Sequence, residues 1–109
     1  MNHAANRVLR DRIRSNRAAA RIRRRGAGSI ATHCIAAGLR PGEARSVAST
    51  LRKHVAKAGV TGVAGTAYNG RVPAHPCTRF TRSQIGRLAA SYRPRKAAYK
   101  AARAVLISA

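Results

Sequence analysis

Apolar residues recur at helical spacing in several stretches of this chain, most clearly between residues 42 and 58. Apolar positions three, four and seven apart predict one helix here with a single apolar stripe. Pro41 opens this helix, because its fixed φ suits a first turn, and Gly59 ends it. The stripe comprises Ala44, Val47, Ala48, Leu51, Val55 and Ala58.

Three shorter patterns predict further helices. The first spans 30–37, where Ser29 can cap the amino end and Gly38 can close the carboxyl end in the left-handed conformation. The second spans 82–90 and is capped by Thr81, and the third runs from Pro94 to Leu106 or Ile107. The residues expected to face inward in the last two are Ile85, Leu88, Ala89, Ala98, Ala101 or Ala102, Val105 and Leu106.

The segment from Val60 to Phe80 is rich in Gly, Val, Thr and Pro instead. Asn69-Gly70 is a hairpin signal, because both residues accept the positive φ of a type I′ turn. We expect a short two-stranded ribbon, Val63–Tyr68 and Arg71–Ala74, which Pro73 and Pro76 stop.

The predicted fold is therefore mainly α: two helix pairs with a short β-hairpin between them and a basic arm at the amino end. Residues 1–28 form the arm and its hinge, Gly26-Ala27-Gly28, and residues 29–109 form the helical domain. Residues 1–6 are expected to be frayed.

The arm, residues 7–25, contains nine arginines and one acid, Asp11. It lacks glycine and proline and contains alanine, leucine and isoleucine, which favours a helix, although its charge opposes one until a polyanion binds. A solvated, disordered tail is the alternative. The arginines are expected to point in nearly every direction: Arg7, Arg10, Arg14, Arg17, Arg21 and Arg24 lie three or four apart, and Arg12, Arg23 and Arg25 fill the other sides.

The net charge of +21 is the first feature of the sequence that indicates a function. The 23 Lys and Arg residues face only two acids, Asp11 and Glu43. Such an imbalance destabilises a compact chain unless an anion binds, and it is typical of nucleic-acid-binding domains. Arginine predominates over lysine, which favours bidentate contacts with phosphates and bases.

Membrane insertion and export are not expected from this sequence. No apolar run has the length of a bilayer span, and no secretory signal precedes the two cysteines, so we expect a reducing, cytoplasmic location, with the nucleoid if the source is bacterial. The Arg-rich start also resembles a mitochondrial transit peptide, which is the alternative.

Two segments resemble the helix-turn-helix family of DNA-binding proteins. Residues 84–89 (QIGRLA), followed by Arg93-Pro94, match a first helix and turn, with Gly86 at the crowded small-residue position and Lys96 as a departure. Residues 32–47 (THCIAAGLRPGEARSV) carry the other half of the pattern: Gly38 at the turn, then Leu39, Ala44 and Val47, with His33 as the departure.

The resemblance implies that base edges are reached from the starts of the second helices. It assigns this role to Arg45, Ser46 and Ser49 in one pair, to Arg95, Lys96 and Tyr99 in the other, and a winged-helix-like contact to Arg71 at the ribbon tip. Two ordinary helical hairpins in a small α-bundle are the alternative.

The arm resembles the basic region of basic leucine-zipper proteins. Asn16, Ala19, Ala20 and Arg24 have the spacing that those proteins use in the major groove. The match fails at Ile22 and Arg23, and no leucine heptads follow. The same composition would also serve an arm that folds on structured RNA.

Metal and catalytic chemistry have weak support. Zinc at His33, Cys34, His75 and Cys77 is an alternative, but neither pair has CxxC or HxxxH spacing, so we assign no metal or other cofactor. With two carboxylates in the chain, paired-carboxylate catalysis lacks its ligands, and nothing orients a base for a Cys77 nucleophile. We therefore predict that the protein is not an enzyme.

The sequence thus predicts a small DNA-binding protein, regulatory or DNA-organising, in a phage, plasmid or bacterial setting. RNA binding within a ribonucleoprotein is the main alternative, and association with an acidic protein or a packaged genome is a third; the oligomeric state is left open. The predicted nucleic-acid-binding residues are Arg7, Arg10, Arg14, Asn16, Arg17, Arg21, Arg23, Arg24, Arg25, Arg45, Arg52, Arg71, Arg93, Arg95, Lys96, Lys100 and Arg103.

Overall fold

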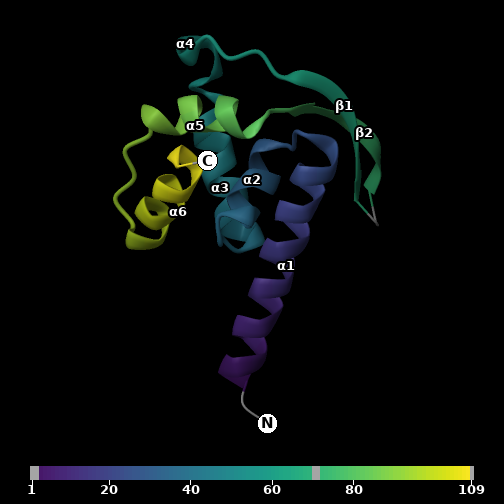
Figure 1. The fold of residues 1–109 in the computed structure, drawn as a ribbon, viewed down its shortest axis with the longest axis vertical. Coiled ribbons are helices and arrows are strands. Elements are labelled where there is room, and N and C mark those ends of the chain that lie inside the picture. The colour runs from purple at the N-terminus through teal and green to yellow at the C-terminus, as the bar shows by residue number, and fades with distance from the viewer. Residues whose placement is uncertain (1–2, 70–71, 109) are drawn as a thin grey trace.

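A computed structural model describes residues 3–69 and 72–108 of the chain. This part is mainly helical, with six helices and one antiparallel hairpin, which confirms the predicted fold class (Figure 1). The elements are α1 (His3–Arg25), α2 (Ile30–Ala36), α3 (Pro41–Arg52), α4 (Val55–Ala58), β1 (Val63–Asn69), β2 (Val72–Arg79), α5 (Arg82–Ala90) and α6 (Ala97–Ile107).

The core forms where α2 and α3 meet α5 and α6. Its fully buried side chains are aliphatic and small: Leu51 of α3 and Leu88 of α5 are both completely shielded from solvent. The predicted inward residues Ile85, Leu88 and Ala89 are buried, and so are Ala102 and Leu106 of α6. Ala98, Ala101 and Val105 are exposed instead, because α6 turns Tyr99 towards the core.

Local signals placed α2, the start of α3 and α5 correctly. The Ser29 side chain accepts a hydrogen bond from the Thr32 amide, and Thr81 accepts one from the Gln84 amide, so both predicted caps are confirmed. Gly38 has a φ of +104°, as expected for the residue that closes α2. Pro41 begins α3 in its predicted position.

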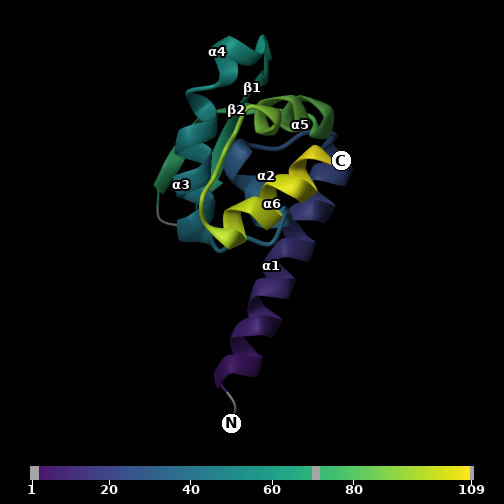
Figure 2. The same cartoon turned by 90° about the vertical axis from the view of Figure 1, so that its left-hand side faces the viewer.

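The carboxyl-terminal half of α1 packs against α2. Ala18 and Ile22 are buried, and the Ser15 hydroxyl donates a hydrogen bond to the Ala36 carbonyl oxygen at 3.0 Å. These residues are three and four apart and form one docked face. The amino-terminal half of α1 extends beyond the body in both Figure 1 and Figure 2, and residues 3–6, expected to be frayed, belong to the helix.

Phe80 ties α1, α2 and the hairpin together. Its amide donates to the Gly28 carbonyl oxygen at 2.8 Å, and its own carbonyl oxygen accepts from the Gly28 amide at 3.0 Å and from His33 Nε2–H at 2.7 Å. The predicted hinge glycine Gly28 is therefore buried in a β-bridge. The division of the chain at residue 28 into an arm and a domain stays a prediction.

Burial lowers the pKa of His33 below its usual value, and the positive charge of Arg82 adds to the effect, while the Phe80 carbonyl opposes it. The unfolded chain therefore binds a proton at a higher pH than the folded chain does. We expect the free energy of unfolding to fall as the pH drops below about 6.5. Urea titrations at several pH values check this, and His33→Gln should flatten the dependence; an unchanged pH profile in that variant would contradict it.

The predicted helix 42–58 is wrong as one continuous element. It is interrupted at Lys53 and His54, whose amides bond to Thr50 and Leu51, three residues back instead of four. This tight turn separates α4, which contacts α5, and leaves Val55 half-buried against the core. The apolar spacing could not reveal the turn because Val55 still follows Leu51 by four residues.

The predicted end of the second strand is also wrong. β2 continues past Pro73 and Pro76 to Arg79, and Pro76 pairs with Thr66 of β1. In a two-stranded ribbon each strand has an outer edge, where a proline nitrogen removes no ladder hydrogen bond. Asn69 belongs to β1 and pairs with Val72, with a register shift between Ala67 and Asn69; the expected Asn69-Gly70 turn lies partly outside the described residues.

The last helix begins at Ala97 and not at Pro94. Arg93, Arg95 and Lys96 carry three positive charges around the predicted start, where the positive end of the helix dipole repels cations. The Arg93 guanidinium instead donates to the Ala90 carbonyl oxygen at 2.7 Å, at the negative end of α5.

Candidate nucleic-acid interface

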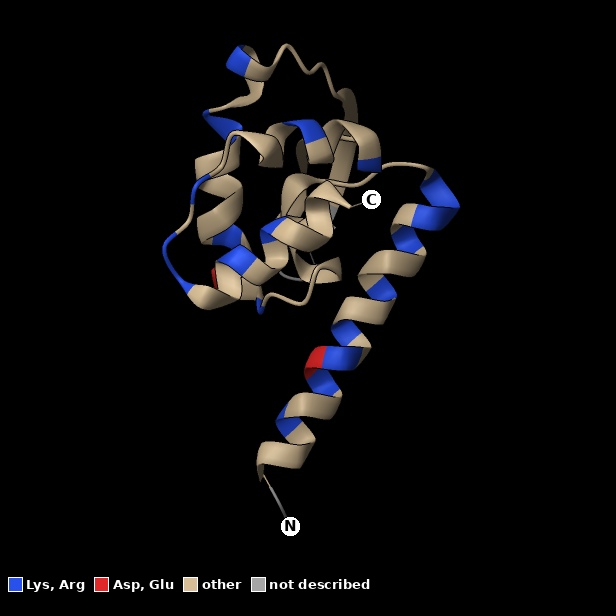
Figure 3. Cartoon of the chain, turned by 60° about the vertical axis from the view of Figure 1, so that its left-hand side comes forward, with Lys and Arg blue, Asp and Glu red and all other residues tan. Residues whose placement is uncertain are grey.

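Six arginines of α1 form one stripe along the helix. They lie three or four residues apart, and Arg25 continues the stripe because it follows Arg21 by four. A helix segment from residue 7 to 25 is about 27 Å long. Figure 3 shows basic positions along the whole length of α1. The expectation that these side chains point in nearly every direction is thus refined: one face is docked, and this stripe, Arg7, Arg10, Arg14, Arg17, Arg21 and Arg24, is exposed.

Three neighbouring hollows meet beside this stripe and form a surface that we name the arginine groove. The largest has a volume of about 1070 Å³ and lies between α1, α2, α3 and the hairpin. Smaller ones, of about 290 and 200 Å³, lie at the carboxyl end and along the middle of α1. All three share Arg21 and Thr32, so they adjoin one another. Their arginines are Arg14, Arg17, Arg21, Arg25, Arg45, Arg52 and Arg79.

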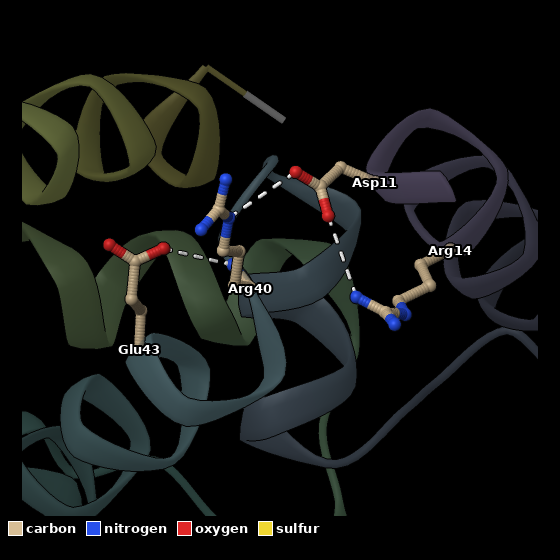
Figure 4. A network of polar contacts seen from close by, with 4 residues as sticks. All are labelled: Asp11, Arg14, Arg40 and Glu43. Atoms are coloured by element: carbon tan, nitrogen blue, oxygen red, sulfur yellow. Dashed lines mark hydrogen bonds and ion pairs between the residues drawn. The ribbon is translucent and has the colours of Figure 1, made fainter. Parts of the chain in front are cut away.

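Neither acid of the sequence lines this groove. Asp11 bridges α1 to the turn before α3: its carboxylate lies 3.4 Å from Arg14 Nη1 and 3.3 Å from Arg40 Nε (Figure 4). Glu43 Oε1 accepts a hydrogen bond from the Arg40 amide at 3.1 Å. Asp11 partly compensates Arg14 at the edge of the groove, whereas neither carboxylate pairs with the other six groove arginines, which leaves most of the charge of the groove uncompensated.

The exposed side of α3 presents the first set of residues that the helix-turn-helix resemblance assigned to base contacts. Arg45, Ser46 and Ser49 are exposed, whereas Ala44 and Val47 are buried, as the pattern required. His33, the departure from that pattern, is buried and hydrogen-bonded to Phe80. α3 thus carries a continuous polar face with an arginine near each end.

The second predicted set, on α5 and α6, does not line the groove. Arg103 donates to the Ala89 and Ala90 carbonyl oxygens at 3.1 Å each and stabilises the carboxyl end of α5, with Arg93 beside it. Lys96 lies over the Tyr99 ring at 5.3 Å from its centroid. Gly86 is at a crowded position, as predicted, since a Cβ there would lie 3.3 Å from the Leu106 carbonyl oxygen.

The remaining predicted residues are distributed around α1. Asn16, Arg23 and Arg24 are exposed, and Ala19 lines a hollow against α2 and α6. Arg95, in the segment between α5 and α6, and Lys100 of α6 are exposed. Arg71 lies outside the described residues.

The histidines and cysteines proposed as a zinc alternative do not converge. Among the described residues, no group of three or more His, Cys, Asp or Glu side chains is arranged to hold a metal ion. Cys34 is buried, and burial raises its pKa to about 12. Cys77 is half-buried and lines the groove.

Sequence reasoning missed Arg79 and Arg40. Arg79 belongs to the groove through the register of the hairpin, which places its guanidinium 2.9 Å from the Thr66 carbonyl oxygen. Arg40 reaches Asp11 across 29 residues of sequence. Neither contact has a local signal, because both depend on how elements distant in the sequence pack.

The chain matches no protein family, no curated protein and no solved structure. None of its described helices combines the length and the apolar character that crossing a bilayer requires.

Proposed function

We propose that this protein binds double-stranded DNA through the arginine groove and the arginine stripe of α1. The observation that carries the proposal is the convergence of seven arginines from three elements on one groove that neither carboxylate lines. Arginine guanidinium groups bind phosphate oxygens bidentately, and a polyanion relieves the repulsion among these side chains.

The shape of the interface suggests that phosphate contacts and base contacts come from different parts of it. The groove is concave and suits a ridge of phosphates, which fixes position without reading sequence. The exposed face of α3, with Arg45, Ser46 and Ser49, borders the same groove and is the element we propose to approach base edges. The regulatory or DNA-organising role predicted from the sequence follows from this proposal.

The test measures binding of a labelled duplex at increasing salt, with structured RNA, single-stranded DNA and heparin as competitors. If the stripe and groove neutralise about 6–10 phosphates, the affinity should fall by about 10³–10⁵ between 50 and 200 mM salt. Structured RNA that competes better than duplex DNA would favour the ribonucleoprotein alternative. Absence of binding to any polynucleotide would reject the proposal.

Cys77 reports whether the ligand lies in the groove. The thiol lines the two hollows nearest the hairpin, whereas Cys34 is buried with a raised pKa, so an alkylating reagent should modify Cys77 in the folded protein. We expect bound duplex DNA to slow alkylation of Cys77. Equal rates with and without DNA would place the ligand elsewhere.

A further inference from the structure

One of the three hollows differs from the rest of the groove in how its arginines are held. It lies between the carboxyl end of α1 and the hairpin and has a volume of about 290 Å³. Arg21 and Arg25 enter from α1, one helical turn apart, and Arg79 enters from β2. We name this hollow the arginine cradle. Three hydroxyl-bearing residues also line it: Ser29, Thr32 and Thr66.

Arg79 is positioned by the strand opposite it. Its Nη2 donates to the Thr66 carbonyl oxygen at 2.9 Å, and its guanidinium lies over Gly65. A Cβ at residue 65 would lie 2.8 Å from Arg79 Nη1, closer than real Cβ atoms approach, and 3.0 Å from Cζ, so the guanidinium would have to move aside. Because Gly65 has no side chain, the Arg79 guanidinium can occupy the space above it, which we call the seat of Arg79.

Holding an arginine in advance favours anion binding. A guanidinium that already has a fixed orientation loses less conformational entropy when it closes on a ligand. The Thr66 carbonyl takes up one of its donors, and the others remain for a bidentate contact. Arg79 is therefore arranged as a binding residue and not as a freely moving surface charge.

The charges of the cradle require a partner. Three guanidinium groups line one small hollow, and its lining residues include neither Asp11 nor Glu43. Like charges at such proximity repel one another, and a phosphate between them would convert repulsion into charge-assisted hydrogen bonds. The hollow, with a volume of about 290 Å³, is large enough to admit a phosphate group.

We propose that the arginine cradle holds one phosphate group, which Arg79 binds from the seat made by Gly65. The inference rests on the proposed function for the source of the phosphate, an internal phosphodiester or a terminal phosphate of the bound DNA. The cradle thereby fixes where along the groove the backbone lies, because the Thr66 carbonyl oxygen orients Arg79 before the DNA binds.

The decisive variants alter the position or the shape of the positive group at residue 79 and leave the net charge unchanged. Gly65→Ala leaves the net charge intact but displaces the Arg79 guanidinium, and Arg79→Lys keeps the charge but loses the planar fork. Each should weaken duplex binding about tenfold, the loss of one charge-assisted hydrogen bond. The double variant should be no weaker than either single one, because both remove the same contact.

Gly86→Ala is the matched control. Its Cβ would crowd the Leu106 carbonyl oxygen at 3.3 Å, so it strains the packing of α5 against α6, away from the groove. We expect wild-type affinity for DNA from this variant. If Gly65→Ala and Arg79→Lys both fold, by circular dichroism, and bind duplex like wild type, the cradle proposal is wrong while the proposed function stands.

Two further measurements identify the source and separate the proposals. Duplexes with and without 5′-phosphates distinguish a terminal phosphate, which binds more tightly only when present, from an internal phosphodiester, which gives equal affinities. Inorganic phosphate is titrated against the guanidinium NMR signals of the folded chain. This titration decides the case in which the wild-type protein does not bind duplex DNA: a saturable shift in wild type that Gly65→Ala abolishes supports the cradle, and the absence of a shift in wild type overturns it.

Discussion

Replacing Arg21, Arg45 and Arg52 together with glutamine is expected to weaken binding of duplex DNA by at least about 100-fold. These arginines come from α1 and α3 and line the largest hollow of the arginine groove. A hydrogen bond to a charged group contributes about 1.5–3 kcal/mol, so the loss of three should be large even if their effects overlap. The slope of log affinity against log salt should decrease by about 3 units, since each phosphate contact contributes about 0.9. Fluorescence anisotropy across a salt series measures both quantities.

The control removes the same amount of charge elsewhere. Lys53, Lys57 and Arg87 are exposed and do not line any of the three hollows. Their joint replacement with glutamine lowers the net charge by the same three units, so a purely diffuse attraction would respond equally to both triple variants. Equal losses of affinity would mean that DNA binding depends on the total charge and not on where the charges lie, so the groove would have no special role.

Ile22→Ala is expected to lower the free energy of unfolding by about 2–5 kcal/mol, the usual range for truncating a buried isoleucine. Ile22 is only 3% exposed and is the largest buried side chain that α1 contributes to its contact with α2. Its side chain also closes over Gly28, where a Cβ would lie 3.0 Å from Ile22 Cγ1. Urea unfolding followed by circular dichroism measures the effect, and an unchanged m-value would show that the variant differs in stability alone.

Ile13→Ala provides the comparison on the same helix. Ile13 is 41% exposed, so its truncation should change stability by no more than about 0.5 kcal/mol. Weaker DNA binding by Ile22→Ala under conditions where the protein remains folded would show that docking of α1 aligns the arginine stripe with the groove. Similar stabilities for the two variants would mean that α1 is not docked in solution.

The docking of α1 links the fold to the proposed interface. Ser15, Ala18 and Ile22 hold one face of the helix against α2, and this contact turns Arg14, Arg17 and Arg21 towards the groove. Asp11 adds a second point of attachment through Arg40. The two half-exposed ion pairs of Asp11, with Arg14 and Arg40, contribute little stability by themselves.

Local physical chemistry made several elements predictable from sequence. Ser29 and Thr81 mark helix starts because their side-chain oxygens satisfy free amides, and Gly38 marks a helix end because it accepts a positive φ. The inward residues of α5 followed from spacing alone. These predictions succeeded because each depends on atoms within about four residues of one another.

Predictions failed where distant parts of the chain decide the outcome. The break at Lys53–His54 depends on the contact of α4 with α5, and the continuation of β2 through Pro76 depends on the hairpin having an outer edge. The docked face of α1 was missed because it has one large apolar residue, Ile22, among arginines. Long-range packing supplies no signal at the spacing of a single helix or strand.

The sequence by itself determined the helical class, the helix caps and the excess of positive charge, because these follow from residue types and their near neighbours. The tertiary structure alone decided which arginines lie together. It brings Arg21, Arg45 and Arg79 from three elements to one groove, seats Arg79 over Gly65, and keeps both carboxylates off that surface. Such an arrangement depends on packing between segments far apart in the chain, and for that reason no local pattern contains it.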